Sequence, residues 1–259
     1  MYSSMRWRFL TSPAGDGPGN MALDDALMGR AARTGEAVFR VYSWRTPTLS
    51  LGRNQRARGA YDLHAARRLG VAIVRRPTGG RALLHDHEVT YSATLPTATA
   101  ADAAAAYDFI NRVLLGALER LGVNATLAVG AASIPPGIRP CFDAPSEHEI
   151  VLGDRKLVGS AQWRRGGALL QHGSILVRDD QAVIGDLMHD GWANPPVAAT
   201  LAESIGREPS VSEVADAIAA ALAATQGGTP LALDPEPEVR AAADTLRNTY
   251  LDDAWTWRR

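Results

Sequence analysis

The chain contains very little lysine and cysteine. Lys156 is the only lysine among 27 basic residues, and Cys141 is the only cysteine. A single cysteine excludes an internal disulfide bond and is typical of proteins from a reducing compartment. The lysine is informative because arginine supplies every other basic side chain, and a compact ammonium can do chemistry that a planar guanidinium cannot. Together they suggest a covalent acyl-transfer site, the alternatives being a packed cysteine and a solvated lysine.

Long apolar runs and strong net charge are also absent. The 259 residues carry a formal net charge of −1 and a pI near 6.6, so no overall basic field attracts nucleic acid or anionic membrane. The first twenty residues lack the apolar core of a signal peptide, and no apolar run reaches spanning length. We therefore expect a cytoplasmic protein with no nucleic-acid or membrane partner. A hydrophobic content of 46% is enough for a sizeable core.

Strand-like patterns fill the first two thirds of the chain, and helical patterns fill the rest. This order predicts an α+β fold rather than a doubly wound sheet. We expect one domain over residues 1–259, with a core over about 1–180 and a helical C-terminal extension over about 181–259. The predicted strands are 6–10, 38–44, 48–51, 71–74, 87–95, 149–152, 156–163 and 168–177, and the predicted helices are 20–33, 62–69, 103–121, 211–224 and 238–251.

Residues 75–86 form a segment rich in arginine and glycine, with the sequence RRPTGGRALLHD. Glycine has no side chain, so the turn at Gly79-Gly80 allows its backbone N–H groups to approach a ligand closely. The turn could line a channel for a thin acyl chain or hold a phosphate, although the spacing of a P-loop is absent. An ordinary turn between strands is the alternative.

Two further segments carry the thiol and the ammonium. Cys141 lies in a proline-rich stretch over 130–148 that is predicted to be a long loop, where an exposed nucleophile is plausible. In the following predicted strand, period-two alternation places Lys156, Val158 and Ser160 on one face. The small residues at 159–161 leave room for a ligand beside that strand.

These segments, in this order, resemble the biotin/lipoate protein ligase superfamily, and within it the cysteine-dependent octanoyltransferases of lipoyl synthesis. The matching stretches cover residues 19–176, about two thirds of the chain. They read GNMALDDALM (19–28), TLSLGRNQ (48–55), RRPTGGRALLHDHEVTYS (75–92), CFDAPSEHEI (141–150), RKLVGSAQ (155–162) and LQHGSIL (170–176).

The resemblance implies a catalytic domain with a mixed, mainly antiparallel sheet flanked by helices. It also implies transfer of octanoyl from acyl carrier protein onto Cys141 as a thioester. The octanoyl group then passes to a lysine of a lipoyl-carrier domain, such as the glycine cleavage H protein. Lys156 would be the partner of Cys141 in this chemistry. The implied substrate-binding residues are Arg76, Thr78, Gly79, Gly80, Arg81, His85, Gly159, Ser160, Ala161 and His172.

Thioester exchange conserves the energy of the acyl donor, so we expect no cofactor. Three alternatives remain open. An ATP-dependent lipoate–protein ligase would need ATP and magnesium. Its glycine segment usually has three consecutive glycines, whereas Arg81 follows Gly80 here, and the segment after His85-Asp86 also departs from the ligase pattern. A carrier-to-carrier amidotransferase would use the same thiol chemistry, and a non-enzymatic carrier-binding scaffold would need neither Cys141 nor Lys156.

Four further expectations concern metal binding, the oligomeric state, the C-terminal tryptophans and a group of arginines. No set of histidines has the spacing of a metal site, so we expect no metal. We expect a monomer, and we expect the tryptophans at 255 and 257 to pack onto the domain. Arg53, Arg56 and Arg58 either form a surface complementary to an acidic acyl carrier protein or belong to a solvated loop.

Overall fold

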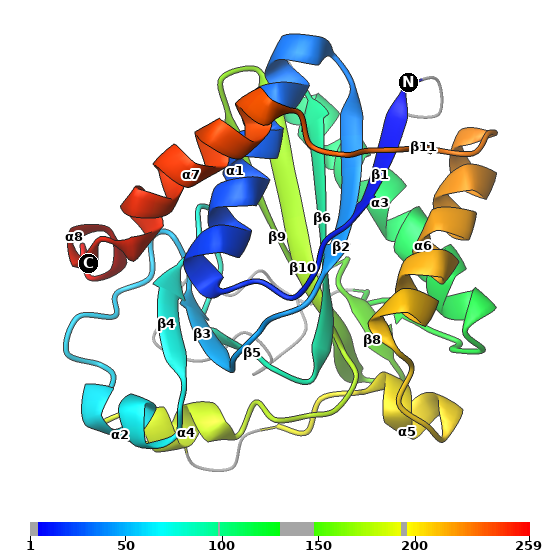
Figure 1. Ribbon diagram of the computed structural model, residues 1–259. Helices are drawn as coiled ribbons and strands as arrows, with labels where there is room; N and C mark the ends of the chain where they lie inside the picture. Colours follow the sequence, from blue (N-terminus) through cyan, green and yellow to red (C-terminus); the bar gives the residue numbers. More distant parts are fainter. Residues whose placement is uncertain (1–4, 98, 130–147, 193–195) are drawn as a thin grey trace.

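An eight-stranded mixed sheet is the centre of the fold in the computed structural model, which describes residues 5–97, 99–129, 148–192 and 196–259 (Figure 1). Its strand order is β11-β1-β2-β6-β10-β9-β8-β7. The pairs of β1 with β11 and with β2 are parallel, and the other neighbours are antiparallel. The prediction of an α+β fold with a mainly antiparallel mixed sheet is therefore confirmed. The strands are β1 (Trp7–Thr11), β2 (Ala37–Tyr42), β6 (Glu88–Pro96), β7 (Thr126–Leu127), β8 (Ile150–Leu152), β9 (Arg155–Arg165), β10 (Ala168–Leu176) and β11 (Leu231–Ala232).

A second, three-stranded sheet lies beside the large one, in the order β4-β3-β5. The parallel pair of β3 and β4 is joined through helix α2, whose N-cap Asp62 accepts hydrogen bonds from two backbone N–H groups of the first turn. The sequence did not predict β5, because its three residues are too few to show a period. The elements are β3 (Thr48–Leu51), α2 (Leu63–Arg68), β4 (Ala72–Arg75) and β5 (Leu83–His85).

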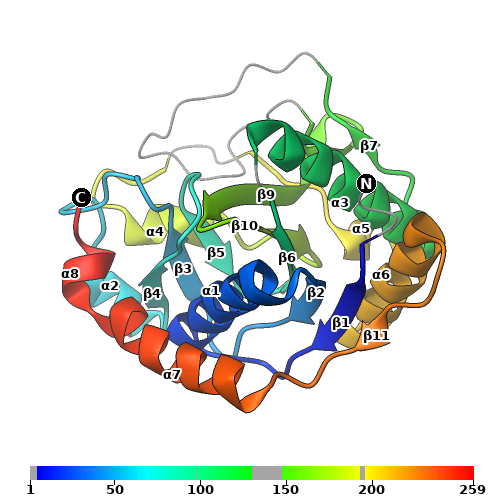
Figure 2. The same cartoon turned by 90° about the horizontal axis from the view of Figure 1, so that it is seen from above.

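The two faces of the large sheet are covered by different helices (Figure 2). Helices α3 (Ala100–Arg120) and α6 (Val211–Gln226) pack on one face and form the main apolar core with it. Helix α1 (Gly17–Thr34) and the small sheet cover the other face. Strand β6 shows why both faces can be buried: its apolar side chains alternate with polar ones, and the apolar set, Val89, Tyr91, Ala93 and Leu95, faces α3.

Helix α1 begins earlier than the sequence predicted. Its N-cap is Asp16, whose side chain accepts a hydrogen bond from the backbone N–H of Gly19, and a proline occupies the first turn, where no donor is lost. Asn20, where the predicted helix over 20–33 begins, is instead a buried residue within the helix, and its amide donates to the carbonyl of Ser43 at 3.2 Å.

The C-terminal third is part of the domain core rather than an appendage. Helix α7 (Pro237–Leu251) lies along α1, and α6 packs on α3 (Figure 1). Strand β11, which the sequence did not predict, extends the large sheet at its β1 edge within this otherwise helical segment. The remaining helices are short: α4 (Val183–Leu187), α5 (Leu201–Ile205) and α8 (Asp253–Thr256).

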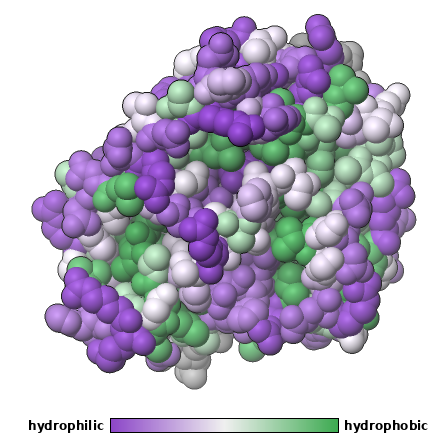
Figure 3. Space-filling model, viewed as in Figure 1, coloured by the Kyte–Doolittle hydropathy of each residue, from purple (hydrophilic) through white to green (hydrophobic). Residues whose placement is uncertain are grey.

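On the face that Figure 3 shows, the surface contains both hydrophilic and hydrophobic residues. Hydrophilic residues lie over α7 and α8, and hydrophobic residues form separate patches. Within the residues that the structure describes, no helix has both the length and the apolar character needed to cross a membrane.

Candidate active site

A cavity opens between the small sheet, α1 and strands β9 and β10. Gly80, Ser160 and Ala161 line it and are at least partly exposed, so they mark its mouth. Met21 and Tyr42 line it and are 1% and 0% exposed, so they mark its closed end. The other lining residues are Trp44, Arg76, Leu83, His85, Thr90, Gly159, His172 and Gly173.

The Arg76 side chain organises the glycine loop at the mouth. Its guanidinium donates to the carbonyls of Gly79 (2.9 Å) and Arg81 (2.7 Å) and, on β3, to the carbonyl of Ser50 (3.0 Å). Gly80 has φ +92°, a conformation that side chains disfavour, and a Cβ there would also lie 2.8 Å from the guanidinium. The backbone conformation at position 80 therefore favours glycine, and the buried Arg76 guanidinium holds the Gly79-Gly80 turn in place.

His172 of β10 lies on the cavity wall within a chain of hydrogen bonds. Its Nδ1 faces the Asp24 carboxylate at 3.3 Å, and its Nε2 lies 2.6 Å from the Thr78 hydroxyl. A carboxylate beside Nδ1 places the proton there, so Nε2 accepts from Thr78. Burial lowers the pKa of His172 below its ordinary value, although hydrogen bonding to Asp24 opposes this effect. The ring is therefore a neutral imidazole at pH 7.

Asp24 is fully buried on α1, and its carboxylate accepts several hydrogen bonds. Arg40 donates to it at 2.7 Å, Ser92 at 2.7 Å and Tyr42 at 3.0 Å. Burial alone would raise the pKa of Asp24, but the Arg40 charge and the hydrogen bonds from His172 and Ser92 outweigh it and lower the pKa. The carboxylate thus stays ionised beneath the cavity.

His85 forms a second chain of the same kind, which meets Arg76 at the Ser50 hydroxyl. Its Nδ1 lies 2.7 Å from Glu88, and its Nε2 lies 2.7 Å from the Ser50 hydroxyl. The ring stacks on Trp44 with centroids 4.0 Å apart. Glu88 also accepts hydrogen bonds from the hydroxyls of Thr90 and Ser174.

These two chains explain how a cavity with so many polar residues can hold an apolar ligand. Both nitrogens of His85 and of His172 are bonded to protein groups, as is the Thr90 hydroxyl. The polar atoms thus satisfy one another, and an apolar chain can enter without leaving a buried donor or acceptor unpaired. The arrangement is suited to an acyl chain.

The sequence-predicted residues reach this site to different degrees. The cavity wall includes Arg76, Gly80, His85, Gly159, Ser160, Ala161 and His172. Thr78, Gly79 and Arg81 lie in the loop next to it and act through the hydrogen bonds described above. The sequence did not point to Met21, Tyr42, Trp44, Leu83, Thr90 or Gly173 as lining residues, because only the tertiary structure brings α1 and β2 to the cavity.

Lys156 does not line the cavity. It is 3% exposed, lies on β9 four residues before Ser160, and its ammonium donates to Glu149 Oε1 at 2.6 Å. The strand pairing confirms the predicted alternation, since Ser160 pairs with Gly173, and Ala161 with His172 on the other face. Glu149 as the partner carboxylate was not predicted. Cys141 lies outside the described residues.

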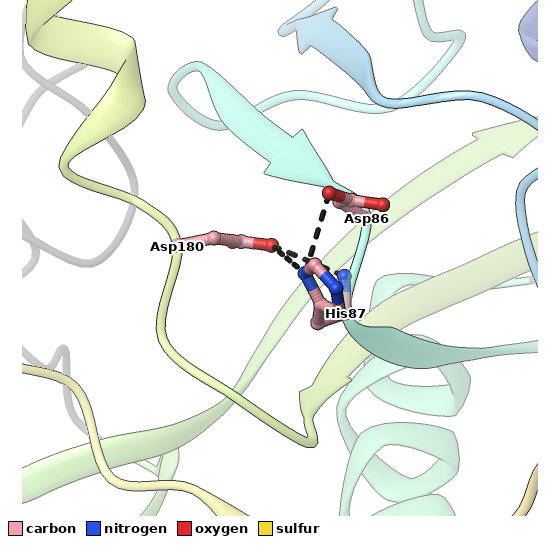
Figure 4. Close-up of side chains that lie close together, drawn as sticks. All are labelled: Asp86, His87 and Asp180. Carbon is pink, nitrogen blue, oxygen red and sulfur yellow. Dashed lines mark hydrogen bonds and ion pairs between the residues drawn. The ribbon is translucent and has the colours of Figure 1, made fainter.

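A separate polar cluster lies on the segment between β5 and β6 (Figure 4). His87 Nδ1 is 3.3 Å from Asp86 and 3.2 Å from Asp180, and the backbone N–H of His87 also donates to Asp180. Burial raises the pKa of Asp180, and hydrogen bonds from His87 oppose the rise. These three side chains could approach one cation, a grouping that sequence spacing did not indicate; in the structure they join the β5–β6 turn to the segment after β10.

Solved structures with the same fold are lipoate protein ligases. A putative lipoate protein ligase from T. acidophilum superposes with a TM-score of 0.82 at 22% identity, covering 98% of this chain and 100% of the other. A lipoate-protein ligase A bound with ATP gives 0.80 at 21% identity, covering 98% of each chain. At such identities the likeness defines the class of fold, the lipoate-ligase type of catalytic domain, which confirms the predicted architecture.

Sequence relatives define the family more closely. Residues 16–223 match the family described as the lipoyl protein ligase A/B catalytic domain, and the chain belongs to this family. The octanoyltransferase LipM of Kyrpidia tusciae is 36% identical over 98% of this chain and 99% of its own length. That of Symbiobacterium thermophilum is 37% identical over 98% of each chain. The resemblance inferred from the motifs is thus confirmed.

Proposed function

We propose that this protein is an acyltransferase that moves octanoyl from acyl carrier protein, through a thioester on Cys141, to a lysine of a lipoyl-carrier domain. The observation that carries the proposal is the cavity whose histidine, threonine and tyrosine side chains are hydrogen-bonded to other protein groups, in a chain whose full-length relatives are octanoyltransferases. The glycine cleavage H protein is the kind of acceptor we expect. We also expect one domain, a monomer and a cytoplasmic location.

The reaction has two steps that each exchange one acyl bond. The Cys141 thiolate attacks the carbonyl of the octanoyl thioester, the carrier's thiol leaves as a thiolate, and octanoyl remains on the enzyme. The amine of the acceptor lysine then attacks this thioester, the Cys141 thiolate leaves, and the amine loses a proton as the amide forms. The first step conserves the energy of the donor thioester, and the second step is favourable because an amide is more stable than a thioester, so neither ATP nor another cofactor is needed.

Lys156 supplies the positive charge in this scheme. An ammonium can favour the thiolate and can donate a hydrogen bond to the oxyanion that develops on the acyl carbonyl. The hydrogen bond from Lys156 to Glu149 fixes the direction of the ammonium, because a buried cation keeps a buried carboxylate as its partner. Glu149 is therefore a positioning residue in this proposal.

The cavity receives the acyl chain with its free end inward. The carboxyl end is attached to a protein that cannot enter, so it must stay at the mouth beside Gly80 and Ala161. The methyl end then reaches Met21 and Tyr42 at the closed end. Apolar burial of the chain favours binding by about 0.8 kcal/mol per methylene.

Intact-mass spectrometry tests the proposal. The purified protein is mixed with octanoyl-acyl carrier protein in the absence of ATP, and an octanoyl adduct that maps to Cys141 is expected. Added H protein should then remove the adduct and gain it on one lysine. Cys141→Ala is the matched control, which should form no adduct. Acylation of the acceptor only with ATP and free octanoate would instead identify a ligase.

A further inference from the structure

A continuous row of arginine and tryptophan side chains runs from the cavity mouth to the C-terminus. The Arg53 guanidinium lies 4.6 Å from the ring centroid of Trp163 and 5.4 Å from that of Trp255. Arg165 stacks on the same Trp163 at 4.5 Å, and Arg258 stacks on Trp255 at 4.2 Å. These contacts join the loop after β3, the end of β9 and the C-terminal segment.

Backbone hydrogen bonds fix the C-terminal residues against this loop. The N–H groups of Ala57 and Arg58 donate to the main-chain oxygen of Arg259 at 3.0 and 2.9 Å. Arg58 Nε donates to the carbonyl of Trp257 at 3.0 Å. Figure 2 shows the C-terminus beside the loop between β3 and α2. Two segments about 200 positions apart in the sequence therefore place five arginines on one surface. We call this surface the arginine rim; its residues are Arg53, Arg56, Arg58, Arg258 and Arg259.

The rim adjoins the mouth of the cavity. The N–H of Arg53 donates to the carbonyl of Thr78 at 2.7 Å, and a Cβ on the preceding Gly52 would lie only 1.9 Å from the oxygen of Gly80. Trp163 follows the mouth residue Ala161 by two positions on β9. A protein docked on the rim would thus hold its prosthetic arm directly beside the opening.

The rim concentrates positive charge without neutralising it. None of its five arginines forms an ion pair with a carboxylate among the described residues, and Arg56, Arg58 and Arg259 are exposed. The acidic residues nearest to it in sequence are Asp62, the N-cap of α2, and Asp252 and Asp253 at the start of α8. Because the whole chain has a net charge of −1, this local excess must be balanced by acidic residues elsewhere.

Burial and the like charges of neighbouring arginines act together on Arg75 and Arg258. Burial and the nearby charges of Arg258, Arg76 and Arg259 lower the pKa of the fully buried Arg75 to about 10. Burial and the charges of Arg53 and Arg259 likewise lower the pKa of Arg258. Arg75 Nη2 and Arg258 Nε are buried without a hydrogen-bond partner within the described part of the chain. An anionic partner would relieve this repulsion.

We propose that the arginine rim is the docking surface for the acidic acyl carrier protein that delivers the octanoyl group, rather than for the acceptor domain. This inference rests on the proposed function. Charge complementarity raises the rate of encounter with an oppositely charged protein by ten-fold or more at low salt. The rim lies beside the mouth, where the acyl end of the donor must enter. The negative charge of an acidic carrier protein is complementary to the positive charge of the rim.

The test compares a protein donor with a small donor. The variant is Arg56→Glu/Arg259→Glu, which reverses two exposed charges of the rim. Arg112→Glu/Arg120→Glu is the matched control, because it makes the same charge change on exposed residues of α3, on the other side of the sheet. Acylation of Cys141 is followed by intact mass with octanoyl-acyl carrier protein and with octanoyl-pantetheine, at low and high salt.

We expect the rim variant to lose about ten-fold in kcat/KM with the carrier at low salt, to lose less at high salt, and to stay within two-fold with octanoyl-pantetheine. The control should stay within two-fold with both donors. Equal losses with both donors, or no loss with the carrier, would overturn the inference. A slower second step alone, measured with preloaded acyl-enzyme and H protein, would overturn it in favour of the acceptor. If the wild-type protein takes octanoyl from neither donor, the proposed function itself fails.

Discussion

The two faces of the large sheet are both buried, yet they are built from opposite kinds of residue. On the α3 and α6 face, β6 contributes Val89, Tyr91, Ala93 and Leu95 to the main apolar core. On the α1 face the same strand contributes Glu88, Thr90, Ser92 and Thr94, all at most 4% exposed. The first face needs only apolar contact, whereas on the second face the side chains of Glu88, Thr90 and Ser92 are hydrogen-bonded to one another or to Asp24, Trp44, His85 and Ser174. The Thr94 hydroxyl is buried without a partner among the described residues. The difference separates a face that stabilises the fold from a face that forms a binding cavity.

Lys156 complicates this division. By alternation it belongs with Val158 and Ser160 on the α3 side of β9, and it is paired with Glu149 rather than with the cavity network. The proposed chemistry thus joins groups from both sides of the sheet at its β9 end. The following predictions test the division, from the largest expected effect to the smallest.

The Asp24 carboxylate is the centre of the polar face, so its removal should have the largest effect. Asp24→Ala leaves the buried Arg40 without its ion pair, and we expect a loss of about 3–5 kcal/mol in the free energy of unfolding. Leu114→Ala on the apolar face should cost a similar ~2–5 kcal/mol. Urea unfolding measures both. Only Asp24→Ala should also slow octanoyl uptake by the folded fraction. A cost under 1 kcal/mol for Asp24→Ala would contradict the role assigned to it.

Lys156→Arg tests whether a point charge is required where β9 meets β8. The charge is kept but the donor geometry changes, so we expect a retained fold and a rate of Cys141 acylation lower by about 10²–10³ fold, as for loss of one oxyanion donor. Circular dichroism and the intact-mass assay measure these two properties. Turnover close to that of the wild type would show that Lys156 is only the structural partner of Glu149.

Met21 and Met28 offer a matched pair on helix α1. Met21 closes the cavity, whereas Met28 packs with Ala31, Ala168 and Leu170 away from it. In Met21→Ala we expect the preference between decanoyl and octanoyl donors to shift about ten-fold towards decanoyl, as two more methylenes become buried. Met28→Ala should lose stability without such a shift. The same preference in both variants would show that Met21 does not end the acyl site.

His172 predicts a modest pH dependence of stability. Its folded-state pKa is lowered by burial, so between that pKa and the unfolded value of about 6.5 only the unfolded chain binds the proton. The free energy of unfolding should therefore fall as pH drops below about 6.5. Urea unfolding at pH 7.5 and 5.5 should show that the advantage of the wild type over His172→Gln shrinks at the lower pH. A constant difference would mean that the imidazole is not held neutral.

Local pattern was sufficient for most elements and for the motif residues. Alternation in β6, β9 and β10 and the apolar stripe of α3 each follow from one segment, because period and burial are set by immediate neighbours on a face. The errors came from other causes. The early start of α1 depends on the Asp16 cap within a glycine-rich stretch, and β5 and β11 are strands of three and two residues that exist only through their partners.

The sequence by itself determined the family and the class of reaction that it implies, because the ordered motifs around the Thr-Gly-Gly turn, Cys141 and Lys156 are recognisable without coordinates. Only the tertiary structure decided what surrounds them. It brings Met21, Tyr42 and Trp44 to the cavity, pairs Lys156 with Glu149, and lays Arg258 and Arg259 against the loop at Arg53–Arg58. These contacts join segments that are as many as 205 positions apart in the sequence. Their geometry follows from packing, which no local pattern contains.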